Sequence, residues 1–106
     1  MNVEKLRQIL EKRMNLHPED PTVEIYWKEE TDIFSENIDA TIAFFENECT
    51  IKELTWFCEV FDDIIEKTQS KILISVWEKR LEEITDMNEK SIVETDIEFA
   101  KLNLKK

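Results

Sequence analysis

The sequence predicts an all-α protein, a single-domain bundle of about five to six short helices that spans residues 1–106. Apolar residues recur at three- and four-residue spacing in every long segment, as they do in amphipathic helices. The chain contains no glycine, so the favoured turn residues of β-hairpins are missing. Only short polar segments separate the periodic ones, which predicts one domain without a linker.

The first half of the chain contains two predicted helices and one ambiguous segment. Residues 3 to 14 place apolar side chains on one face and predict the first helix. Two prolines end it, and Asp20 is suited to cap the segment that follows. Residues 23 to 27 alternate in the manner of a strand, but the stretch is short and we favour a helix. Residues 35 to 47 return to helical spacing and predict one continuous helix.

The helix over residues 50 to 68 has the strongest signals in the chain. Thr50 and Glu53 have the spacing of a capping box, and a long apolar series follows them. Ser70 is suited to cap the next helix, whose apolar stripe reaches Ile84. Because the connection is short, we expect these two helices to pack as an antiparallel hairpin.

A last helix is predicted near the C-terminus. Ser91 and Glu94 repeat the capping-box spacing, which places the start of this helix at Ser91. Its expected buried stripe comprises Ile97, Ala100, Leu102 and Leu104.

The chain is strongly acidic. Twenty-five Asp and Glu outnumber fourteen Lys and Arg, which gives a formal charge of −11. Such a surface repels nucleic acid and anionic membranes and speeds the encounter with basic proteins, although many proteins are acidic for solubility alone. The N-terminus lacks a secretory signal and no apolar run could cross a bilayer, so we expect a cytoplasmic protein.

The residues needed for catalysis or cofactor binding are scarce. His17 is the single histidine, so no Ser-His-Asp or Cys-His arrangement has support without it. Phosphate-binding loops need glycine, and helical di-iron sites need Glu-x-x-His pairs. In a reducing cytosol Cys49 and Cys58 are expected to be small buried hydrophobes. The sequence therefore predicts a binding protein without enzymatic activity, metal or cofactor.

One row of carboxylates is the candidate binding surface. Helical spacing aligns Glu59, Asp62, Asp63 and Glu66 on one side of the 50–68 helix, and Glu46 and Glu48 extend the row. These charges repel one another, which favours a docking surface for a basic protein over a merely solvated face. Trp56 lies beside the apolar stripe and is expected to be partly exposed near this row, whereas Trp77 is expected in the core.

The segment from Glu46 to Ser70, together with residues 96 to 100, resembles immunity proteins of bacterial contact-dependent growth inhibition systems. The resemblance covers roughly the central and C-terminal two-thirds of the chain. It implies a protein that binds and neutralises the C-terminal toxin domain of a sibling cell, and many such toxins are nucleases that act on RNA. An acidic inhibitor could occupy the cationic cleft of a nuclease. The competing interpretation is an acidic helical adaptor or regulatory subunit that binds an unrelated basic protein.

Overall fold

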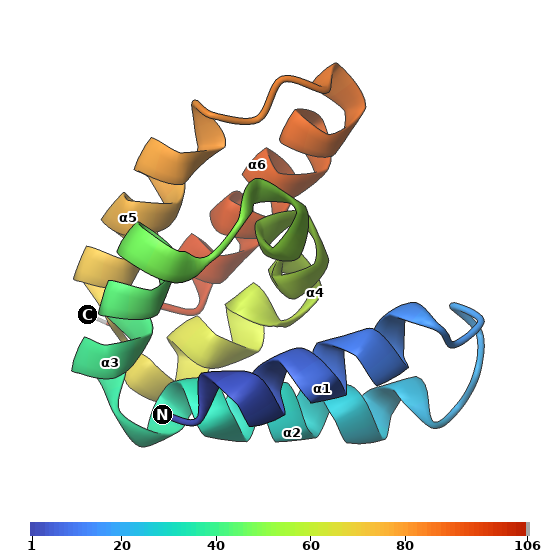
Figure 1. Cartoon of the computed structure of the whole chain (residues 1–106). Helices are drawn as coiled ribbons and strands as arrows, with labels where there is room; N and C mark the ends of the chain where they lie inside the picture. Colours follow the sequence, from blue (N-terminus) through green and yellow to red (C-terminus); the bar gives the residue numbers. More distant parts are fainter. Residues whose placement is uncertain (106) are drawn as a thin grey trace.

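The computed structural model describes residues 1–105, and in that part of the chain every regular element is helical, which confirms the predicted all-α class. The elements are α1 (Val3–Met14), α2 (Val23–Glu36), α3 (Ile38–Ala43), the π-helical turn η1 (Phe44–Glu48), α4 (Ile51–Thr68), α5 (Lys71–Leu81) and α6 (Met87–Leu102). Figure 1 shows α1 and α2 side by side at the lower edge, with α4 between this pair and the α5–α6 pair. The bundle is thus organised around α4.

Helix α2 differs from the sequence prediction in its length and in its N-cap. Residues 23 to 27 are helical, as favoured, but their helix continues to Glu36. Asp20 does not cap α2, because Thr22 is the N-cap residue and its side chain makes no capping bond. Asp20 instead accepts hydrogen bonds from the backbone nitrogen and the hydroxyl of Thr22, at 2.8 and 2.6 Å, and closes the turn ahead of the helix.

The helix predicted over residues 35 to 47 is interrupted. Asn37 has an extended backbone, and its side-chain oxygen caps α3 by accepting a hydrogen bond from the Ala40 nitrogen at 3.1 Å. The buried Thr41 hydroxyl donates to the Phe34 carbonyl at 2.6 Å and ties the two helices together across the break. Residues 35 and 36 therefore end α2, and the continuous helix was a wrong prediction.

The π-helical turn η1 allows two consecutive phenylalanine rings to pack in the core. Phe44 and Phe45 are adjacent in the sequence and both are buried, together with Phe34 and Phe57. Neighbouring residues of an α-helix point about 100° apart, so a wider turn helps two consecutive rings face one core.

In the second half of the chain, the predicted caps of α4 and α5 are confirmed, but the predicted packing of these two helices is not. The Thr50 and Glu53 capping box is present, and the Ser70 side chain caps α5. Gln69, in the left-handed conformation, ends α4. The predicted α4–α5 hairpin is only a minor contact, because α4 packs mainly against α6 and α2, and α5 packs mainly against α6.

The start of α6 was predicted too late. Asp86 is the N-cap residue, and its carboxylate accepts from the nitrogens of Asn88 and Glu89 at 2.9 and 3.0 Å. Ser91 lies exposed within the helix, so its spacing to Glu94 is not a cap. Leu102 was expected in the core, but 78% of it is exposed.

The core is aromatic and continuous. Trp77 is fully buried, as predicted, and stacks on Phe61 with 4.1 Å between ring centroids. Cys49 and Cys58 are buried free thiols, which confirms their expected packing role.

Candidate functional site

The outward face of α4 carries the predicted carboxylate row. Asp63 and Glu66 are exposed, whereas Glu59 and Asp62 are half-buried. Within residues 1–105, Asp62, Asp63 and Glu66 form no salt bridge, although eight such bridges occur elsewhere. The row therefore presents three carboxylates whose charges no cation neutralises by direct contact.

Glu59 is held differently from the rest of the row. The Arg13 guanidinium donates two hydrogen bonds to its two oxygens, at 2.7 and 2.8 Å. The Trp27 indole nitrogen donates a third at 2.6 Å. The Arg13 guanidinium also lies 5.3 Å from the centre of the Trp56 ring. Glu59 thus joins α4 to α1 and α2, and its charge is paired with that of Arg13.

Asp62 and Asp63 lie on opposite flanks of the α4 face. The backbone carbonyl of Asp62 accepts from the Asn103 side chain at 3.0 Å, which places Asp62 beside the end of α6. Asp63 and Glu66 line a hollow of about 360 Å³ between α2 and α4, which Glu24, Lys28 and Lys67 also line. The row therefore borders both neighbouring helices of α4.

The carboxylates of this region repel one another. Burial raises the pKa of Asp63 above its ordinary value, and the charges of Asp62 and Glu66 raise it further. Burial also raises the pKa of Asp96 on α6, and the charges of Asp62 and Glu59 add to that rise. Neighbouring negative charges therefore disfavour ionisation on both flanks of α4, at Asp63 beside α2 and at Asp96 on α6.

Glu46 and Glu48 are exposed and lie ahead of α4. The row begins at Glu59, roughly 12 Å along the helix axis from the first residue of α4. The backbone carbonyls of Glu46 and Glu48 accept from Arg80 and Arg7, which fix this end of the bundle. The part of Glu46 and Glu48 in the binding surface stays a prediction.

Trp56 is half-buried, which confirms the expected partial exposure. It lines a groove of about 370 Å³ between α4 and α6, together with Glu59, Ile92 and Asp96. This groove connects the acidic face of α4 to the surface of α6.

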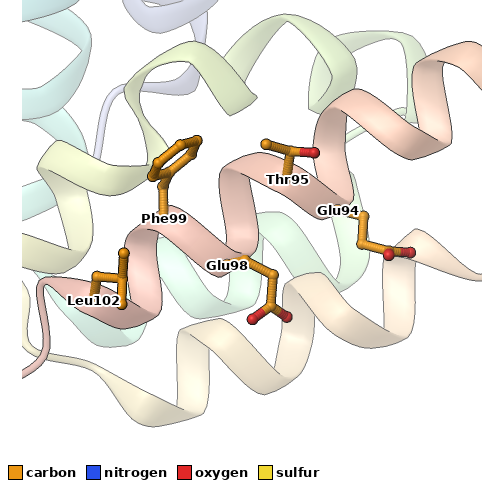
Figure 2. Close-up of a pocket in the computed structure, with 5 residues that line it drawn as sticks. All are labelled: Glu94, Thr95, Glu98, Phe99 and Leu102. Carbon is orange, nitrogen blue, oxygen red and sulfur yellow. The ribbon is translucent and has the colours of Figure 1, made fainter.

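Sequence reasoning missed the exposed apolar residues of α6. Ile92, Phe99 and Leu102 are 59%, 57% and 78% exposed. Phe99 and Leu102 line an open hollow of about 310 Å³ together with Glu94, Thr95 and Glu98. Figure 2 shows these five side chains on α6. The missed signal is that α6 carries a second apolar series at a spacing of seven and three, in addition to its buried stripe.

The two thiols are unsuited to act as nucleophiles at neutral pH. Burial raises the pKa of Cys49 to about 12, and burial also raises the pKa of Cys58 strongly. Among residues 1–105, no three His, Cys, Asp or Glu side chains are grouped so that they could hold a metal ion. Over the same residues, no helix has the length and apolar character to span a membrane.

No protein family model, curated protein or solved structure matches this chain.

Proposed function

We propose that this protein is an immunity protein of a contact-dependent growth inhibition system, which binds and neutralises the C-terminal toxin domain of its own system in the cytosol. The observation that carries the proposal is the outward face of α4, where Asp62, Asp63 and Glu66 have no cationic partner within residues 1–105. The resemblance of residues 46–70 to such proteins supports it.

Some carboxylates near the row have lysine partners, which Asp62, Asp63 and Glu66 lack within residues 1–105. Lys28 and Lys67 both pair with Asp32, and Lys101 pairs with Glu78 and Glu98. Carboxylates without such partners repel one another, and a bound cationic surface removes that repulsion. A partner rich in Lys and Arg therefore fits the row better than solvent does.

The proposed mechanism is electrostatic and requires no catalysis by this chain. A nuclease holds the phosphates of its substrate with cationic side chains. A row of carboxylates can bind those cationic side chains and exclude the nucleic acid. The Arg13 and Trp27 bonds to Glu59 join α4 to α1 and α2, so the helix that carries the row is already fixed in the bundle before binding.

Co-expression tests the proposal. The probe is the C-terminal domain encoded by the reading frame directly upstream, because an immunity gene lies downstream of its toxin. Induced alone in a laboratory bacterium, this domain should stop growth, and co-expression of the wild-type protein should restore growth. The two proteins should also co-purify.

The control is the C-terminal domain of an unrelated nuclease toxin, against which the protein should give no protection. Growth arrest that persists despite equal expression of both proteins would reject the proposal. Stable binding to a basic protein other than a toxin would instead support an acidic adaptor.

A further inference from the structure

Helix α6 is apolar on two faces. Its inner face buries Val93, Ile97 and Ala100 against the bundle. A second series, Ile92, Phe99 and Leu102, faces solvent, and each member is more than half exposed. Isolated exposed apolar residues are common, but a series along one helix that borders an open hollow is typical of an interaction surface.

The charges around this stripe are almost all negative. Glu94 and Glu98 line the same hollow as Phe99 and Leu102, as Figure 2 shows. Asp96 lines the groove beside Ile92, together with Glu89. The two lysines of α6 already pair with carboxylates, Lys90 with Glu82 at 3.9 Å, and Lys101 with Glu78 at 3.0 Å and with Glu98 of the border at 3.1 Å.

These charges decide what can cover the stripe. A second copy of the chain would bring carboxylate against carboxylate, and each copy carries a formal charge of −11. A partner whose exposed apolar side chains are surrounded by Lys and Arg would complement both the apolar stripe and its acidic border. The groove lined by Trp56, Glu59 and Ile92 joins this region to the acidic face of α4.

We infer that α6 supplies the apolar centre of the partner-binding surface: Ile92, Phe99 and Leu102 insert between apolar side chains of a basic protein, while the carboxylates of α4 and α6 contact its Lys and Arg residues. The inference rests on the proposed function for the identity of the partner, but not for its chemistry. In such interfaces a few apolar anchors carry most of the affinity, and charges set rate and selectivity.

The first test needs no toxin. The probe is a synthetic amphipathic helical peptide of leucine and lysine, titrated into the full-length ¹⁵N-labelled protein. Amide shifts should concentrate on α6, and Phe99→Ser should weaken binding by about tenfold. The matched control is Ile25→Ser on α2, because Ile25 is 56% exposed against 57% for Phe99. A peptide with glutamate in place of lysine should not bind.

The second test uses the toxin domain encoded upstream. The Phe99→Ser, Leu102→Ser double variant should bind it at least about tenfold more weakly than wild type, and Ile25→Ser should bind it normally. Thermal unfolding of both variants should stay close to wild type, because the replaced side chains are exposed. The wild-type chain alone should sediment as a monomer.

The outcomes separate the two proposals. Normal toxin binding by the double variant overturns the α6 inference and leaves the immunity function standing. If the wild-type protein does not bind the toxin domain, the proposed immunity function is overturned. The peptide titration alone then tests the inference about α6. Peptide shifts centred on another helix, or a dimer closed through α6, also overturn the inference.

Discussion

Replacement of Arg13 by alanine should lower the free energy of unfolding by about 2 to 3 kcal/mol. The Arg13 side chain is only 7% exposed, and it makes two hydrogen bonds to Glu59. It also lies against the rings of Trp27 and Trp56. The variant leaves the half-buried Glu59 carboxylate without its cation and opens a gap between α1 and α4. Urea unfolding at pH 7 measures the change.

Arg7 provides a matched control for this prediction. It also makes two hydrogen bonds to a glutamate of α4, Glu53, but its side chain is 44% exposed. Exposed ion pairs contribute little, so Arg7→Ala should cost about 1 kcal/mol or less. If both variants lost equal stability, the buried Arg13 cluster would not be the main link between α1 and α4.

Replacement of Glu30 by glutamine should stabilise the protein at pH 8 by about 2 to 4 kcal/mol and have little effect at pH 4. Glu30 is 1% exposed, and neither of its oxygens has a hydrogen-bond partner within residues 1–105. Burial, together with the charge of Glu59, raises its pKa from 4.5 to about 8. The native state therefore keeps a proton that the unfolded chain releases between these two pH values.

The sign of the pH dependence follows from this proton. Because the native state binds more protons than the unfolded state, wild-type stability falls as pH rises from 4.5 towards 8. Glutamine cannot ionise, so the free energy of unfolding of the Glu30→Gln variant should lack this decrease between pH 4.5 and pH 8. Denaturation from pH 4 to pH 8.5 measures both curves, with the exposed neighbour change Glu29→Gln as control. Parallel curves for wild type and Glu30→Gln would contradict the account.

Local signals in the sequence located most helices. The prediction of α4 succeeded because a capping box and a long apolar series agree, and α5 begins at its expected cap. The break at Asn37 was missed because helical spacing continues on both sides of it, although asparagine is a preferred N-cap residue. The start of α6 was misplaced because Ser91 and Glu94 copy a spacing that Asp86 and Glu89 also have.

The candidate site was harder to predict because its organisation depends on distant contacts. Spacing aligned Glu59, Asp62, Asp63 and Glu66, but it could not show that Arg13, 46 positions away, pairs with Glu59 alone. Periodicity of α6 suggested one buried stripe, and only the packing reveals that Leu102 lies on a second, exposed one.

The central claim is that unpaired carboxylates on α4 capture a cationic toxin, and the association rate with that toxin domain tests it most directly. The test variant is Asp62→Lys, Glu66→Lys. The control is Glu36→Lys, Asp39→Lys, which changes the net charge equally at two exposed carboxylates without ion pairs within residues 1–105. The control changes lie at the end of α2 and the start of α3, so their effects on the two helix dipoles should offset.

Stopped-flow association should be measured in about 0.05 M and about 0.5 M salt, between which the Debye length falls from roughly 14 Å to roughly 4 Å. The account predicts that the Asp62 and Glu66 variant binds at least about tenfold more slowly than the control at low salt, and that high salt narrows the difference. Equal rates for the two variants would contradict it, because net charge alone would then explain the binding.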